Sequence, residues 1–375
     1  MPHRHHKFLY LLHNRELNEL YVSIAIRAFA LSLIGLFIPI FLLTAGYSLT
    51  LTLIFFAATT ITHVIFTFPA AKIASRFGFK HAILFSSPIL ILAHLGLYGL
   101  DVFQWLFYPT AIFFGISSAL FWIGYHVDFA KFSDKKRRGR EVGFSRVVSI
   151  LFYSAGPVIG GSLILIVGFK VIFLAVSILL MASAIPLFMS KDIHSQTKLS
   201  LKGTFKKRSI KDTLAIAGFG AERAAYVLWI IFIFFTVLGE QYTLLGSVVS
   251  LSLLLGAIFI FIIGKFSDSY RRLVLRVGAI SNALVWFFKS LVSTGPQVFL
   301  VDAFYGATQS MMLVPFDAIS YDKANKQGII RYLIYREMVL NTARFMVLIA
   351  MIFVADISAG FIFGGSLGSL LQLLF

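Results

Sequence analysis

The sequence contains no cysteine among its 375 residues. This absence excludes disulfide bonds, thiolate metal sites and a cysteine nucleophile. Charged residues are also scarce, at 13% of the chain, where an ordinary soluble domain has about 25%. Hydrophobic residues make up 59%, and the mean hydropathy is +0.89. So few polar side chains could not cover the surface of a soluble protein. The composition therefore indicates that lipid surrounds most of this one.

The motifs of the common catalytic sites are missing as well. There is no H-E-x-x-H, no Walker loop and no metal-ligand spacing of His, Asp and Glu. A G-x-S-x-G match at 364–368 has no histidine after it, and Gly360, Gly364 and Gly368 instead form a stripe of small residues typical of helix packing. We therefore expect neither an enzyme nor a cofactor or metal.

Acidic residues are few, at 16 against 33 lysines and arginines, which gives a formal net charge of +17. In a soluble protein this excess would suggest nucleic acid as a partner. Here the basic residues gather in the N-terminal segment and in every second loop afterwards, including 72–80, 131–140, 191–211, 265–276 and 323–336. By the positive-inside rule these loops and both termini are cytosolic, and no nucleic acid is expected.

Apolar runs of roughly 18 to 25 residues fill the rest of the chain, and this is the length that crosses a bilayer. We place them at 20–44, 49–71, 81–100, 103–127, 142–167, 169–190, 213–238, 242–264, 273–293, 297–320, 337–355 and 358–375. The last two are short, so eleven spans is the alternative to twelve. Because only helices satisfy their own backbone groups in lipid, these runs predict an all-α integral membrane protein of the cell or inner membrane.

A polar stretch divides the chain into 1–190, a six-helix bundle, 191–212, a basic cytosolic linker, and 213–375, a second six-helix bundle. The spacing from Gly46 to Lys72 recurs from Gly239 to Lys265. Phe113–Gly115 likewise matches Phe304–Gly306, and Arg140-Glu141 matches Arg336-Glu337. Each pair lies six spans apart, so the two bundles are predicted to be a repeat with the same orientation.

The loop after the second span resembles the signature G-x-x-x-D-R-x-G-R-K-x-x-L of the major facilitator superfamily. It keeps Arg76, Gly78 and Lys80 but has Ala71 and Ser75 in place of glycine and aspartate, while the second copy keeps Gly264 and Asp268. The chain resembles this superfamily over nearly its whole length. The resemblance implies transport by alternating access, with these two loops holding the bundles together on the cytosolic side.

The fifth predicted span contains Gly156-Pro157-Val158-Ile159-Gly160-Gly161. This stretch is similar to the G-P-x-x-G-G core of a motif associated in the superfamily with antiporters. Physically, the glycines permit close helix contact and the proline bends the helix. The resemblance implies antiport, although a tightly packed, bent helix is the alternative. An arginine that many proton-coupled members carry in the fourth span is replaced here by Ala111.

Ionisable residues inside membrane spans are costly, so they are the best candidates for function. Arg27, Arg146 and Arg344 either face a central cavity and bind an anionic or zwitterionic solute, or pair with Glu222, Asp317 or Glu141 to close the cytosolic entrance. Arg27 is the preferred substrate residue, because the first span usually lines the cavity in this family. The aromatic residues expected near the cavity include Trp122, Tyr125, Trp286 and Tyr305.

A buried carboxylate that is alternately exposed could carry a proton. Asp317 is the first candidate, followed by Glu222 and Asp128. His126 also suits proton exchange, and Asp317 is its counterpart in the repeat. The alternative is that each of them only neutralises a nearby arginine.

Together these observations predict a secondary transporter, expected to act as a monomer among membrane lipids, that exports a small amphipathic or anionic solute in exchange for protons. The first alternative is a lipid flippase or an uncoupled facilitator. The second, of another class, is a membrane receptor or scaffold that transports nothing.

Overall fold

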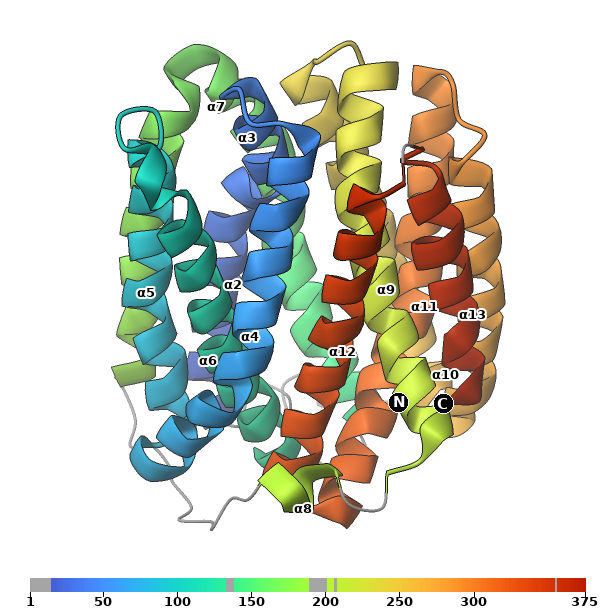
Figure 1. Cartoon of the computed structure of the whole chain (residues 1–375). Helices are drawn as coiled ribbons and strands as arrows, with labels where there is room; N and C mark the ends of the chain where they lie inside the picture. The colour runs from blue at the N-terminus through green and yellow to red at the C-terminus, as the bar shows by residue number, and fades with distance from the viewer. Residues whose placement is uncertain (1–14, 133–137, 189–200, 206–207, 355) are drawn as a thin grey trace, which may run out of the picture.

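The helices of the protein lie side by side with their axes roughly parallel (Figure 1). A computed structural model describes residues 15–132, 138–188, 201–205, 208–354 and 356–375. The side chains of Asp128, of 138–148 and of 264–269 lie outside the described set. No strand occurs in the described ranges.

The first half of the chain, the amino half, supplies six helical spans. They are formed by α2 (Arg15–Ile34) with η2 (Gly35–Phe37) and α3 (Ile38–Thr44), α4 (Leu49–Phe77), α5 (Phe79–Gly99), η3 (Gln104–Leu106) with α6 (Phe107–Phe132), and α7 (Arg138–Ala184) with η4 (Ile185–Phe188). The long helix α7 contains two spans, because the backbone leaves helical geometry at Gly168, whose φ of 74° suits a glycine.

The second half, the carboxyl half, follows the short helix α8 (Leu201–Phe205). Its spans are α9 (Ile210–Phe232) with η5 (Ile233–Val237), the two parts of α10 (Tyr242–Lys289), α11 (Gly295–Gln327), α12 (Ile329–Ile352), and η6 (Phe361–Ser366) with α13 (Leu367–Leu371) and η7 (Gln372–Leu374). Non-helical geometry at Tyr270 divides α10. The prediction of twelve spans is confirmed, and the final span is helical despite its short length.

Seven stretches of the described residues are long and apolar enough by themselves to cross a membrane. The later helices α11 and α12 miss that criterion. They carry buried charged side chains, among them Asp302, Asp317, Arg336 and Glu337. Many large apolar side chains remain exposed around the bundle, such as Ile166, Ile178 and Phe304, as expected of a surface that lipid solvates.

The two halves have the same orientation. Helix α8 and the end of the chain lie at the lower end of the molecule in Figure 1, which we call the linker end, and the loops at 45–48, 238–241 and 290–294 lie at the far end. Six spans return each half to the end at which it began. Gly46 and Gly239, matched in the predicted repeat, both adopt positive φ in the first far-end loop of their half, so the repeat extends to the backbone geometry.

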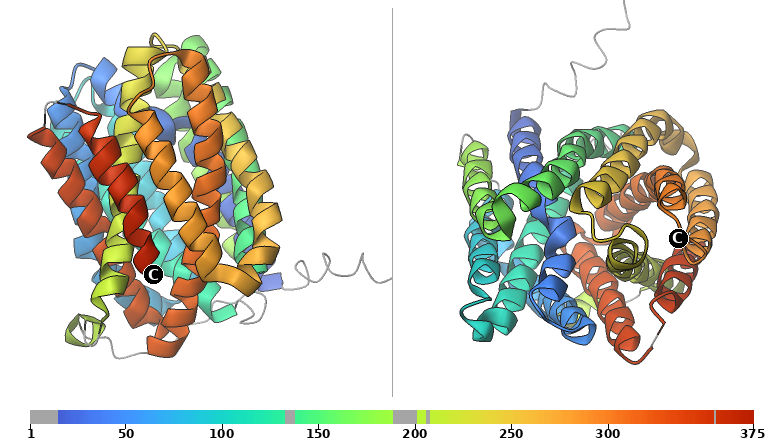
Figure 2. Two further views of the ribbon diagram at one scale, coloured as in Figure 1. Left: turned by 90° about the vertical axis from the view of Figure 1, so that its right-hand side faces the viewer. Right: turned by 90° about the horizontal axis from the view of Figure 1, so that it is seen from above.

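The halves meet along two seams. Seen from above in Figure 2, α4 lies beside α12 on one side of the bundle, and α7 lies beside α10 on the other. At the second seam Gly161 packs against the backbone of Tyr242, and Gly246 packs against the backbone of Pro157. A methyl group at either glycine would overlap with backbone atoms of the other half. Within the G-P-x-x-G-G stretch, Gly161 thus allows helices of different halves to touch, whereas Gly156 and Gly160 pack against Ser32 and Leu33 of α2 in the same half.

Candidate functional site

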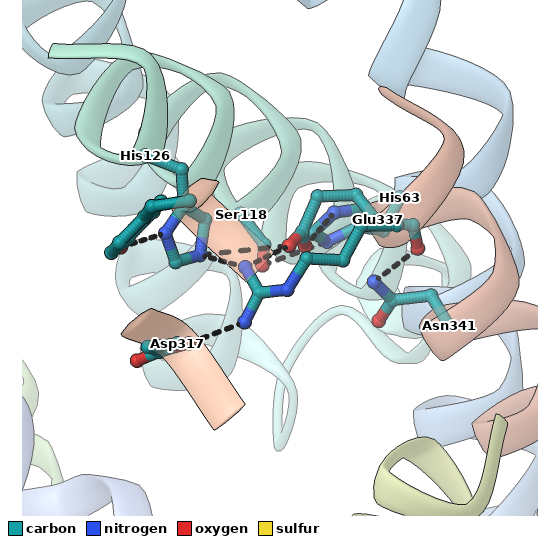
Figure 3. A network of polar contacts seen from close by, with 8 residues as sticks. His63, Ser118, His126, Asp317, Glu337 and Asn341 are labelled. Atoms are coloured by element: carbon teal, nitrogen blue, oxygen red, sulfur yellow. Dashed lines mark hydrogen bonds and ion pairs between the residues drawn. The ribbon is translucent and has the colours of Figure 1, made fainter. Parts of the chain in front are cut away.

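A network of buried polar side chains connects the two halves near the linker end (Figure 3). Its centre is Arg336 of α12, which donates from Nη2 to Asp317 Oδ1 of α11 at 2.6 Å and lies 3.3 Å from Glu337 Oε1. Across the seam, Arg336 Nη1 lies 2.8 Å from Nε2 of His126 on α6. All four side chains are buried. The arginine therefore binds two carboxylates of its own half and an imidazole of the other.

A second imidazole joins the network from the amino half. His63 Nε2 of α4 lies 3.4 Å from Glu337 Oε2, and its Nδ1 lies 2.9 Å from Ser118 Oγ of α6. Thus α4, α6, α11 and α12 each contribute a polar side chain. The network therefore joins two helices of each half at one point.

The protonation state of His126 follows from its partners. A guanidinium can only donate hydrogen bonds, so Nε2 must accept from Arg336 and carries no proton. The remaining proton sits on Nδ1, which donates to the Tyr321 hydroxyl at 2.7 Å. His126 is therefore neutral in this arrangement. With His126 neutral, Arg336, Asp317 and Glu337 sum to a net charge of −1.

A second buried polar group lies wholly in the carboxyl half. Lys289 and Asp302 pair at 2.8 Å, with side chains 0% and 2% exposed. Asp302 also accepts from Trp229 Nε1 at 3.0 Å. The ammonium sits among four rings whose centroids lie between 3.8 and 5.8 Å away, those of Tyr226, Trp229, Trp286 and Tyr305. This is the geometry of an aromatic cage for a cation.

Glu222 of α9 borders this cage and is fully buried. Its Oε1 accepts from the Tyr305 hydroxyl at 2.7 Å and from Trp286 Nε1 at 3.2 Å, and its Oε2 accepts from Gln309 Nε2 at 3.2 Å. Three donors therefore satisfy the carboxylate, and its partners are neutral.

Three arginines inside the bundle have no carboxylate partner within the described part of the chain. Arg27 of α2 lies 4.2 Å above the Phe121 ring and 3.5 Å from Ser87 Oγ. Arg223 of α9 lies 4.9 Å from the Phe219 ring. Arg344 of α12 makes no ion pair or hydrogen bond to any described residue. Arg27 is buried, whereas Arg223 and Arg344 are half-buried. A cation inside a membrane protein without a counter-ion is costly, so such positions call for a function.

Comparison with known proteins identifies the family. The sequence model described as Major Facilitator Superfamily matches residues 20–328. The chain belongs to this superfamily. It is accordingly a multi-pass integral membrane protein with a transporter fold.

Solved structures of the superfamily share its fold at low sequence identity. A proton:xylose symporter, XylE, bound to 6-bromo-6-deoxy-D-glucose, is 14% identical, with a TM-score of 0.74, over 95% of this chain and 94% of that one. The human organic anion transporter MFSD10 (TETRAN) is 10% identical, with a TM-score of 0.71, covering 96% and 98%. The Escherichia coli fucose:proton symporter FucP is 12% identical, with a TM-score of 0.71, covering 96% and 97%. No curated protein sequence matches the chain.

The predicted gate residues of the first copy lie at the end of α4 and the start of α5. Arg76 is exposed near the end of α4, 5.3 Å from the ring of the adjacent Phe77. Gly78 forms the turn into α5 with a φ of 112°. Lys80 is buried and lies 3.4 Å from Glu19 of α2, so this pair connects two helices of the amino half. The structure does not describe the side chains of Asp128, Arg146 and Asp268 or the surroundings of Gly264.

The predicted solute-site residues are divided between the two halves. In the amino half, Trp122 stacks on His126 at 5.2 Å and meets the Tyr125 ring edge-on. Trp286 and Tyr305 line the Lys289 cage in the carboxyl half. Arg27 and Arg344 belong to separate halves. The structure therefore brings His126 and Asp317 together on Arg336, whereas Glu222 belongs to the cage.

Arg223 and Arg344 lie deep along their helices. Helix α9 begins at Ile210, so Arg223 lies about 20 Å along it. Helix α12 begins at Ile329, whereas the predicted span begins at 337, so Arg344 lies about 22 Å along the helix. The polar start of α12 hid roughly its first two turns from a hydropathy reading.

Sequence reasoning also missed the roles of Arg336, Glu337 and His63. In the sequence, Arg336 and Glu337 served only as markers of the repeat, and His63 was not among the candidate site residues. The available signal was that both repeat markers lie inside an apolar stretch, where a charge pair needs partners.

Proposed function

We propose that this protein is a proton-coupled secondary transporter that exchanges protons for a small organic solute, amphipathic or anionic. The observation that carries the proposal is the titratable network between the halves, His126 and His63 on one side and Arg336, Asp317 and Glu337 on the other. Alternating access requires the halves to separate at one end at a time. A proton-sensitive contact between them couples that movement to proton binding.

The coupling step is a change of partner at His126. A proton on Nε2 removes the lone pair that accepts from Arg336 and places a second positive charge beside the guanidinium. Glu337 Oε1, 3.5 Å from the same nitrogen and also on α12, already pairs with Arg336 at 3.3 Å, so it offsets only part of the repulsion between the two cations. The hydrogen bond from Arg336 to His126 is lost, and the remaining repulsion across the seam favours opening of the linker end. Loss of the proton restores the contact.

The groups facing His126 support this assignment. Trp122 and Tyr125 lie on its own helix, Tyr321 approaches from α11, and Arg336 and Glu337 approach from α12. Tyr321 holds Nδ1, so the second nitrogen, Nε2, is the one that exchanges its proton. Asp317 acts by holding Arg336.

The G-P-x-x-G-G stretch supports exchange over cotransport, through the resemblance already given. Its contacts with α10 form the seam opposite the polar network. In this scheme the proton-loaded carrier opens at the linker end and the solute-loaded carrier returns.

The test is solute accumulation by purified protein in liposomes. An acid-inside gradient drives solute into the vesicles if protons leave as solute enters, whereas an acid-outside gradient drives it if both enter together. We expect accumulation only with acid inside, and we expect His126→Gln to retain exchange of labelled for unlabelled solute but to lose accumulation. Flux that is equal under both gradients would refute proton coupling and favour an uncoupled facilitator.

A further inference from the structure

Arg223 and Arg344 lie on two helices of the carboxyl half, α9 and α12, that pack against each other. Their helices touch where Gly220 of α9 packs against the backbone of Leu340 in α12, and each arginine follows that contact by about one turn. The two are close enough for the charge of Arg223 to act on Arg344. Two like charges inside a membrane protein repel each other, so the pair costs stability unless something negative lies between them.

No described carboxylate serves that purpose. Glu222 is adjacent in sequence to Arg223, but its oxygens accept from Trp286, Tyr305 and Gln309. Asp302 is occupied by Lys289 and Trp229. Counting Arg223, Arg344 and Lys289 against Glu222 and Asp302 leaves a net charge of +1 in this part of the protein.

Two tyrosine hydroxyls add to the donors. Tyr226 follows Arg223 by three residues on α9, which places the two on one face of the helix. Tyr153 of α7, in the amino half, lies near enough for the charge of Arg223 to act on it. Neither hydroxyl has a hydrogen-bond partner among the described residues, and both tyrosines are half-buried. The Tyr226 ring stacks on Tyr305 with centroids 5.5 Å apart, which fixes its position. The site therefore has two guanidinium groups and two hydroxyls, contributed by both halves, and no described acceptor.

From this excess of donors we propose that Arg223, Arg344, Tyr153 and Tyr226 form a binding site for a small organic anion with a compact head group, a carboxylate, sulfonate or phosphate. The planar fork of each guanidinium suits such a group, and the tyrosine rings suit an apolar body. The site rests on the proposed transport function and names its solute class. Because Tyr153 comes from the other half, a bound anion would also hold the two halves together.

The experiment measures the thermal stability of the detergent-solubilised full chain at low salt, with benzenesulfonate and with its neutral isostere benzenesulfonamide. Benzenesulfonate should raise the melting temperature of the natural protein and benzenesulfonamide should not, because ligand that binds only the folded state stabilises it. Arg223→Gln and Arg344→Gln should each weaken benzenesulfonate binding about tenfold or more. Arg276→Gln, on an exposed position of α10, is the matched control and should bind as the natural protein does.

The ligand-free variants provide a second readout. Removing either of two repelling charges should raise the melting temperature without ligand, whereas loss of a structural ion pair would lower it. Equal effects of the two probes on the natural protein, or a lower melting temperature in both ligand-free variants, would overturn the site. His126→Gln separates the two proposals: it should bind benzenesulfonate normally even though coupling is lost, so a failed anion site and failed proton coupling give different results.

Discussion

The ion pair between Lys289 and Asp302 offers a direct test of how burial changes the strength of a charge contact. Both side chains are sealed, and the structure gives Asp302 only one other donor among the described residues, Trp229 Nε1. Lys289→Met keeps the apolar stem but leaves a buried carboxylate without a cation. Removing one partner of a buried pair costs about 3–5 kcal/mol, and we expect that loss in the free energy of unfolding.

A matched pair exists at the far end of the same protein. Lys170 and Asp101 lie 2.5 Å apart, closer than Lys289 and Asp302, but both side chains are 51% exposed. Water screens this pair and already solvates both groups, so Lys170→Met should leave the unfolding free energy essentially unchanged. Lys289→Met with Asp302→Asn should recover most of the loss, because the amide oxygen still accepts from Trp229.

The assay is reversible unfolding of the purified protein in mixed micelles, followed by tryptophan fluorescence. Together with Asp302→Asn alone, Lys289→Met and the double variant complete a double-mutant cycle, which measures the coupling between Lys289 and Asp302 directly. If Lys289→Met destabilises the protein no more than Lys170→Met does, the buried pair does not stabilise the cage, and the reasoning is refuted.

Other substitutions test the contacts between the halves. Gly246→Ala inserts a methyl group into the backbone of Pro157, so it should lower both stability and transport, whereas Gly203→Ala in α8, with nothing within 4 Å, should change neither. Arg336→Met should destabilise by about 3–5 kcal/mol by stranding Asp317 and Glu337, and Asp317→Asn in the same chain should restore part of it. Stability is measured by thermal unfolding and transport by uptake into liposomes. If the Arg336→Met protein is as stable as the natural one, the network does not stabilise the fold.

Much of the architecture was predictable because hydropathy and glycine placement are local properties of the sequence. The equal spacing from Gly46 to Lys72 and from Gly239 to Lys265 indicated the repeat. In the structure both glycines adopt positive φ in corresponding turns. The pairing of His126 with Asp317 as counterparts also followed from the repeat register. Their meeting on Arg336 did not, because it depends on how α6, α11 and α12 face each other across the seam.

The depth of Arg344 shows a similar limit. The predicted span begins at 337 whereas α12 begins at Ile329, because the start of that helix carries Arg331 and Arg336 and reads as a polar loop. The direction of a side chain around a helix is equally invisible without the neighbouring helices. Glu222 and Arg223 are adjacent, yet the carboxylate points to Trp286 and Tyr305, whereas the guanidinium lies over Phe219.

The most direct test of proton-controlled opening is the distance between the halves at the linker end. The chain has no cysteine, so Lys72→Cys and Lys326→Cys place spin labels on exposed positions of α4 and α11 without further changes. Electron–electron distance measurements at about pH 5 and about pH 8 bracket the titration of a histidine. We predict a larger population with separated labels at the lower pH, and no pH response when His126→Gln is added. The same distances at both pH values, or the same response with and without His126, would contradict the proposed coupling.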